Sequence, residues 1–144
     1  DPIERLAGIR QGLEEAGISL PDSHIEYVTP DQQGGEKAIQ NLLARGIEFS
    51  AVLAYNDAVA SGAMTMLLDH NINIPNQVSV VGYDDVLLAQ YSRPKLTTLH
   101  YPIEMMASKA AELALQYASG EAPQEGVTYK YTPTIVKRES VARI

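Results

Sequence analysis

Two adjacent carboxylates, Asp84 and Asp85, follow a short apolar run and are well placed to do chemistry. The run is Val78 to Val81, and Gly82 and Tyr83 separate it from the aspartates. An unbroken apolar run of this length predicts a strand that is buried on both faces, as in a parallel sheet. Open parallel sheets bind ligands at the carboxyl edge of their strands, where both aspartates would lie. The alternative is that they cap the next short helix or shape a turn.

A second strand is predicted from Ala51 to Ala54, and it ends in Tyr55-Asn56-Asp57. The helix that follows is expected from about residue 58 to residue 68, with Asp57 as its N-cap. Because the carboxyl ends of parallel strands share one edge of a sheet, Asn56 would point into the same crevice as Asp84.

Other chemistries find less support in the residue pattern. The three histidines, His24, His70 and His100, are far apart and lack metal-ligand spacing, so no metal or cofactor is expected. Serine-nucleophile, phosphate-loop and dinucleotide motifs are absent. One enzymatic alternative stays open, a phospho-accepting aspartate, which would need a second acidic cluster and a nearby lysine. The chain is otherwise not expected to be an enzyme.

Helices and short apolar strands alternate along the chain, which predicts an α/β fold with a mostly parallel sheet flanked by helices. Helices are expected over about 2–16, 36–45, 58–68 and 103–117, with a short helical turn at 86–90. Strands are expected near 25–28, 51–54, 78–81, 96–100, 127–131 and 134–136. Gly34 and Gly35 are interpreted as a loop, and the small residues Ala60, Gly62 and Ala63 as a close helix contact.

The composition indicates one globular domain of 144 residues, with 45% hydrophobic and 20% charged residues. A formal net charge of -7 argues against nucleic-acid binding by this chain alone. There is no signal peptide, no membrane-spanning apolar run and no cysteine. The chain lacks an initiating methionine, so we expect it to be a piece of a longer protein.

Five stretches carry a family resemblance. They are Arg5-Leu6-Ala7-Gly8; Ala54-Tyr55-Asn56-Asp57 with Ala60 and Gly62-Ala63-Met64; Val80-Val81-Gly82-Tyr83-Asp84-Asp85; Leu96-Thr97-Thr98 with Tyr101-Pro102 and Met106-Ala107; and Pro133-Thr134-Ile135-Val136-Lys137-Arg138-Glu139-Ser140-Val141. Together they resemble the lactose/galactose-repressor family of bacterial transcription regulators over essentially the whole chain. The second and third stretches are shared with periplasmic sugar-binding proteins, whereas the last two are characteristic of the repressors. Residues 96–106 and 111–115 are most similar to the galactose-repressor branch.

The resemblance implies a truncated periplasmic-binding-protein-like fold, mainly the C-terminal subdomain of an effector-binding core. Residues 1–100 would form that subdomain, 101–126 would cross to the other subdomain, and 127–144 would return. The first half of the core and a helix-turn-helix head would be missing, so operator DNA would be bound only through that head. The helix at 103–117 would lack its usual partner. We therefore expect it to fold back on its own sheet or to pack against a second copy.

The resemblance also implies binding residues and partners. By position, Arg5, Asn56 and Asp84 match ligand-contacting residues of the family, and Tyr101 matches more weakly. Carboxylates and amides accept from hydroxyl groups, while a guanidinium donates in a fixed fork. The spacing of apolar residues alone predicts that Arg5 lies in solvent, because it is off the apolar stripe of its helix. The implied effector is a sugar or purine, with D-galactose the leading candidate, and the implied protein is a cytoplasmic homodimer that does not bind membranes. A periplasmic sugar carrier stays open as an alternative.

Overall fold

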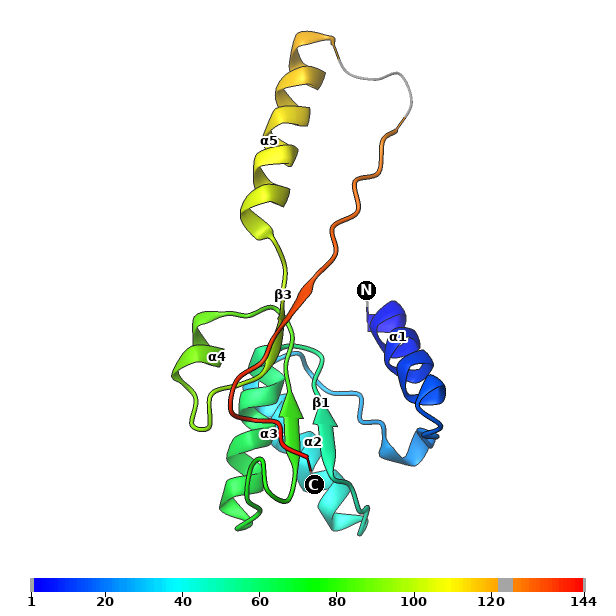
Figure 1. Ribbon diagram of the computed structural model, residues 1–144, viewed down its shortest axis with the longest axis vertical. Helices are drawn as coiled ribbons and strands as arrows, with labels where there is room; N and C mark the ends of the chain where they lie inside the picture. Colours follow the sequence, from blue (N-terminus) through cyan, green and yellow to red (C-terminus); the bar gives the residue numbers. More distant parts are fainter. Residues whose placement is uncertain (1, 122–125, 144) are drawn as a thin grey trace.

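The chain folds into a lobe of helices around a short parallel sheet, with a long helix projecting from it (Figure 1). The computed structural model describes residues 2–121 and 126–143. In chain order its elements are α1 (Pro2–Glu15), η1 (Asp22–His24), α2 (Gln32–Ala44), β1 (Ala51–Leu53), α3 (Asp57–Asp69), β2 (Ser79–Val81), α4 (Leu87–Tyr91), β3 (Thr98–His100), α5 (Ile103–Ser119) and β4 (Thr134–Val136). None of the helices in these residues is long and apolar enough to cross a membrane.

The strands form two short pairs that meet in the middle of the molecule. β1 and β2 are parallel, with Val52 opposite Val80. A single parallel bridge between Val81 and Thr97 then joins β2 to the segment that leads into β3. β3 and β4 are antiparallel to each other, and we call them the crossing strands because they connect the lobe to α5 (Figure 1). The predicted α/β fold class is thus confirmed in its parallel sheet and flanking helices.

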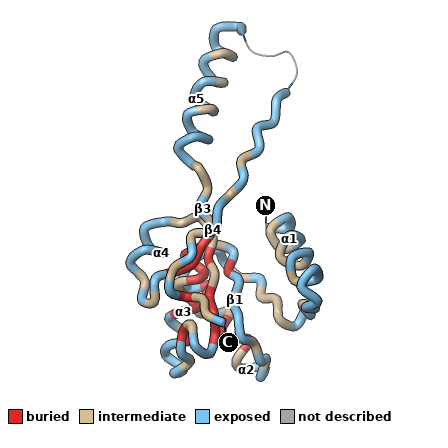
Figure 2. The backbone as a smooth tube through the Cα atoms, in the orientation of Figure 1, coloured by how far each residue is buried: buried red, intermediate tan, exposed pale blue. Residues whose placement is uncertain are grey.

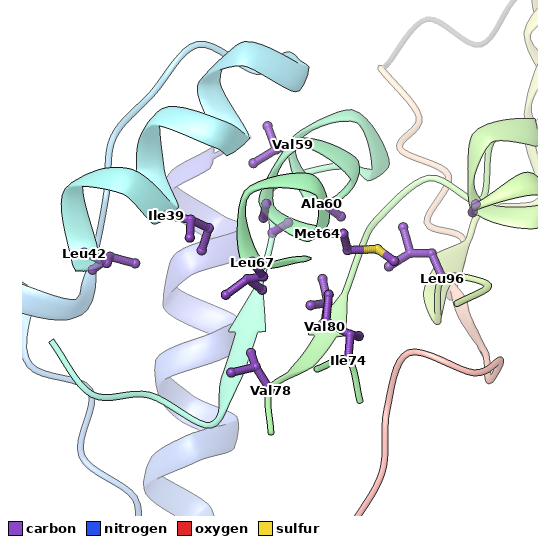
Figure 3. Close-up of a cluster of buried hydrophobic side chains, with 13 residues drawn as sticks. Ile39, Leu42, Val59, Ala60, Met64, Leu67, Ile74, Val78, Val80 and Leu96 are labelled. Carbon is purple, nitrogen blue, oxygen red and sulfur yellow. The ribbon is translucent and has the colours of Figure 1, made fainter. Parts of the chain in front are cut away.

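The hydrophobic core lies between α2, α3 and β2 (Figure 3). Ile39 of α2, Leu67 of α3 and Val80 of β2 are each at most 1% exposed. Burial of side chains of this size stabilises a fold by about 1.5–3 kcal/mol each. Figure 2 shows that buried residues concentrate in this part of the lobe, which therefore forms the rigid base of the sheet edge.

Glycines bring α2 and α3 into backbone contact. A Cβ on Gly35 would lie 2.0 Å from the Val59 carbonyl oxygen, and one on Gly62 would lie 1.8 Å from the Gln32 carbonyl oxygen. The predicted close helix contact is therefore confirmed. The predicted loop at Gly34 and Gly35 is wrong, because α2 begins at Gln32 and contains both glycines. Its N-cap is Asp31, whose side chain accepts from the Gly34 N–H at 2.8 Å.

Two predicted strands, at 25–28 and 127–131, do not form. A strand needs a neighbouring strand for its backbone hydrogen bonds, which a local sequence pattern cannot supply. An apolar cavity of about 450 Å³ separates residues 25–28 from β1 and lies beneath α1. β1 therefore has an unpaired edge on that side, and its Leu53 is 48% exposed.

Helix α5 projects away from the lobe, and none of its residues is buried (Figures 1 and 2). Its longer apolar side chains, including Ile103, Met105, Leu115 and Tyr117, are exposed. The expected fold-back of this helix on its own sheet is therefore wrong. The helix contacts the returning chain through Lys109, whose ammonium lies 4.8 Å from the centre of the Tyr129 ring.

Candidate functional site

The carboxyl ends of β1 and β2 and the first turns of α1 enclose a cavity of about 320 Å³. It is lined by Glu4, Arg5, Gly8, Ile9, Leu53, Ala54, Tyr55, Val81, Gly82, Tyr83 and Leu99. The cavity occupies the edge of the sheet where the strand pattern predicted a polar site. Its walls come from segments far apart in sequence, so the fold assembles this site rather than any single motif.

Arg5 reaches from α1 across the strand ends and stacks on two tyrosine rings. Its guanidinium carbon lies 4.5 Å from the centre of the Tyr55 ring and 3.9 Å from that of Tyr83. Nη1 donates to the Tyr55 carbonyl oxygen at 2.5 Å, and Nη2 lies 3.7 Å from Oδ1 of Asp84. The placement of Arg5 in solvent by its helix pattern is therefore wrong. A stacked and hydrogen-bonded guanidinium has a fixed orientation, with donors left for a ligand.

Asp84 lies next to Arg5 at the end of β2, beside the cavity rather than in its lining. The side chain is 36% exposed, and Arg5 is its charged neighbour. Burial raises the pKa of Asp84 above its ordinary value, the Arg5 charge works in the opposite direction, and the nearby charge of Asp57 adds to the increase. The folded protein thus holds a partly desolvated carboxylate, an acceptor that hydroxyl donors of a ligand would satisfy.

Asn56 lies at the neighbouring strand end, where it caps α3. Its side-chain oxygen accepts from the Val59 N–H at 2.8 Å, and Nδ2 donates to the Pro30 carbonyl oxygen at 3.0 Å. The prediction that Asp57 is the N-cap is therefore wrong, since Asp57 is the first residue of α3 and is 1% exposed. The Asn56 oxygen has a second lone pair, so a capping role does not prevent it from accepting another hydrogen bond.

Tyr101 follows β3 and packs on the back of Tyr83. The ring centres are 5.2 Å apart with a 54° angle between planes, and the Tyr101 hydroxyl donates to that of Tyr83. Burial, helped by this hydrogen bond, raises the pKa of Tyr101 to about 12. Tyr101 therefore supports the ring on which Arg5 stacks. Sequence reasoning missed Tyr55 and Tyr83 as site residues, although each lies two residues after the end of a strand.

Asp85 turns away from the cavity and is held by the side chains of Arg138 and His100. Nη2 of Arg138 lies 2.5 Å from its Oδ1, and Nδ1 of His100 lies 3.0 Å from its Oδ2. The phospho-acceptor alternative called for a lysine and a second acidic cluster, whereas these neighbours are an arginine and a histidine. Among the described residues, no group of three or more histidine and acidic side chains could hold a metal ion.

Comparison with known proteins places this architecture among bacterial regulators. A model of the periplasmic binding protein-like domain matches residues 1–141. The chain is 46% identical over 142 residues to the helix-turn-helix-type transcriptional regulator GalR of Salmonella typhimurium, covering 99% of this chain and 41% of the relative. It is 47% identical to the regulator GalS of the same species, covering 99% of this chain and 42% of the relative. A solved complex of the transcriptional regulator CelR with cellobiose superposes with a TM-score of 0.90 at 31% identity, covering 96% of this chain and 42% of that one. The chain thus spans about two fifths of the length of these relatives.

Proposed function

This chain belongs to the LacI/GalR family of transcriptional regulators, and we propose that it is the part of such a regulator that binds a sugar effector. The relatives GalR and GalS are transcriptional regulators rather than enzymes. Both relatives are named as helix-turn-helix-type regulators, which favours a regulator over a periplasmic carrier.

The observation that carries the proposal is the pairing of Arg5, which lines the cavity, with the partly exposed carboxylate of Asp84 beside it. A sugar hydroxyl is both donor and acceptor, so one hydroxyl can donate to a carboxylate while a guanidinium donates to its neighbour. The guanidinium stacks on the rings of Tyr55 and Tyr83, which fixes its orientation. We propose Arg5, Asn56, Asp84 and Tyr101 as the binding residues, with Tyr101 acting through Tyr83.

D-Galactose is the effector that we propose. Its support is the resemblance of residues 96–106 and 111–115 to the galactose-repressor branch, together with 46–47% identity to GalR and GalS. In the cellobiose complex, a related regulator with nearly the same backbone also binds a sugar.

The intact regulator is proposed to be a homodimer that acts in the cytoplasm. Four apolar side chains in and just before α4 are 38–73% exposed, and they are Val86, Leu87, Leu88 and Tyr91. Large apolar side chains that gather on one surface are typical of protein interfaces. Operator DNA would be bound by a separate head, since this chain carries a net charge of -7.

The chain is proposed to divide into a C-terminal subdomain at 1–100, a crossing segment at 101–126, and returning strands at 127–144. The support is that residues up to β3 build the lobe, whereas α5 stands outside it (Figure 1).

Calorimetry of the full-length regulator with a panel of hexoses tests the proposal. We expect D-galactose to bind, and Asp84→Ala to weaken binding at least about ten-fold, because loss of a charged acceptor costs roughly 1.5–3 kcal/mol. Asp69→Ala, which removes an exposed carboxylate at the far end of α3, is the matched control and should bind as the wild type does. Equal affinity of the Asp84 variant and the wild type would remove this carboxylate from the site.

A further inference from the structure

Asp84 and Asp85 are consecutive residues with positive φ angles, 107° and 54°. Residues other than glycine rarely adopt such angles, and they keep them only where the surrounding contacts hold them. Here the loop that carries the proposed ligand-binding carboxylate departs from ordinary backbone geometry at two successive residues. The contacts that hold this loop therefore set where that carboxylate points.

The strongest of these contacts belong to Asp85. One oxygen accepts from Arg138 at 2.5 Å, and the other faces Nδ1 of His100 at 3.0 Å. Because a carboxylate can only accept, the histidine nitrogen is the donor. The side chains of Asp85 and Arg138 are 11% and 14% exposed, so their ion pair is largely shielded from water.

Arg138 is itself anchored to the segment that leads into the first crossing strand. Its Nη1 donates to the Leu96 carbonyl oxygen at 2.9 Å, and its backbone N–H donates to Oγ1 of Thr97 at 2.9 Å. It follows β4 by two residues, while His100 is the last residue of β3. The two partners of Asp85 thus come from the end of the first crossing strand and from the segment just after the second.

In Asp84, by contrast, the protein binds the backbone and leaves the carboxylate partly exposed. Its backbone N–H donates to the Leu99 carbonyl oxygen at 3.0 Å, which ties the residue to β3. Its carboxylate is 36% exposed and stands 3.7 Å from the Arg5 guanidinium at the cavity. The neighbouring aspartates therefore divide two tasks, since Asp85 is held by the protein and Asp84 faces outward.

We propose that Asp85 is a positioning residue for ligand recognition, which holds the Asp84 carboxylate against Arg5 by pairing with Arg138 and His100. This inference rests on the proposed sugar-binding function. It also links the crossing strands to the ligand, because His100 ends β3 and Arg138 lies two residues after β4. A change in the angle of these strands would displace the carboxylate that reads the sugar hydroxyl.

The test compares Asp85→Asn with Glu139→Gln in the full-length regulator. Glu139 is the matched control, because its carboxylate accepts from the Lys95 N–H at 2.9 Å in the same C-terminal segment, away from the loop. The probes are D-galactose and its epimer D-glucose. We expect Asp85→Asn to weaken galactose binding about ten-fold or more and to reduce the preference for galactose over glucose, measured as the ratio of the two affinities. The control variant should bind both sugars as the wild type does. A variant that was merely unstable would lower the folded fraction equally for both sugars. An unchanged ratio in folded Asp85→Asn would therefore overturn the proposal.

His100→Ala serves as the second variant if Asp85→Asn fails to fold, since the His100 side chain is 50% exposed and its loss leaves the Arg138 pair intact. We expect this variant to reduce the ratio of galactose to glucose affinity as well, by a smaller factor. An unchanged ratio would overturn the inference.

If the wild type binds neither sugar, the proposed function fails, and amide hydrogen exchange of residues 82–91 in the ligand-free regulator decides this inference separately. Faster exchange in folded Asp85→Asn supports the inference, provided that Glu139→Gln exchanges as the wild type does. If Asp85→Asn does not fold, His100→Ala takes its place in this comparison. Unchanged exchange overturns it.

Discussion

The Thr98 hydroxyl donates to Oδ1 of Asp57 at 2.6 Å, which joins the first turn of α3 to the first crossing strand. Both residues are at most 1% exposed. The other oxygen of Asp57 accepts from the Val86 N–H at 2.9 Å, at the entrance to α4. A single buried carboxylate therefore fastens three segments beneath the candidate site.

Replacing Asp57 with alanine should destabilise the full-length protein by about 2–4 kcal/mol, because it leaves the Val86 N–H and the Thr98 hydroxyl without their buried partner. Asp57→Asn should cost less, since an amide can accept from Val86 and donate to Thr98. Urea denaturation of both variants measures the difference. Equal losses would show that the charge of Asp57 matters more than its hydrogen-bond geometry.

Gly82→Ala tests the close approach of β2 to this carboxylate. A Cβ on Gly82 would lie 2.2 Å from Oδ1 of Asp57 and 2.7 Å from Cδ2 of Leu96, so we expect a loss of about 1–3 kcal/mol from overpacking. Gly12→Ala is the matched control in α1, where a Cβ meets nothing within 4 Å, and should stabilise by about 0.5–1 kcal/mol. A neutral Gly82→Ala would mean that the strand end can shift.

Asp84→Asn is expected to stabilise the ligand-free protein at neutral pH while it weakens ligand binding. The raised pKa of Asp84, caused first by burial, means that the folded state binds this proton more tightly than the unfolded chain does. The carboxylate therefore opposes folding above its raised pKa, and this cost disappears as the pH falls to the ordinary value of 3.8. Denaturation at neutral and acidic pH measures the difference in free energy of unfolding between the variant and the wild type. This difference should decrease as the pH falls. An advantage that grows with acid would contradict this assignment.

Charged substitutions in α4 should separate the proposed dimer. Leu87 and Leu88 are 66% and 38% exposed, and a glutamate at either position would have to be desolvated in an apolar interface. We expect Leu87→Glu and Leu88→Glu to sediment as monomers. Ile18→Glu, at a 53% exposed position after α1, is the control and should leave the dimer intact. An unaltered dimer in all three variants would place the interface elsewhere.

Helix α5 should not remain free when the 144-residue chain is studied alone. Each large apolar side chain left in water forfeits roughly 1.5–3 kcal/mol, so association of two copies through this helix is favourable. We expect the molar mass from light scattering to exceed that of one chain. Amide hydrogen exchange over residues 103–117 should be slower than in a free peptide. Leu115→Gln with Tyr117→Gln should shift the mass toward the monomer. A monomer whose α5 exchanges as fast as a free peptide would contradict the expectation.

The sequence predicted those features that depend on local pattern, such as β2 and the small residues of α3 that contact α2. It misassigned the cap of α3, because Asn56 and Asp57 are equally good capping residues and only the fold decides which one is buried. It predicted a strand at 25–28 that needs a partner from elsewhere in the chain. The side-chain contacts of Arg5 and of Asp85 depend on residues about fifty positions away, which no periodicity encodes. The resemblance to a family named Arg5 where the pattern could not.

The glycine contacts between α2 and α3 have a consequence for genetic screens of this regulator. Any side chain at Gly35 or Gly62 would collide with backbone of the opposite helix, so nearly every substitution there should abolish function by preventing folding. A saturation screen scored by reporter expression would therefore mark these glycines as strongly as Asp84, although they lie in the packed interior and not at the cavity. Such a screen distinguishes residues needed for ligand binding from residues needed for folding only when the cellular abundance of each variant is measured alongside reporter expression.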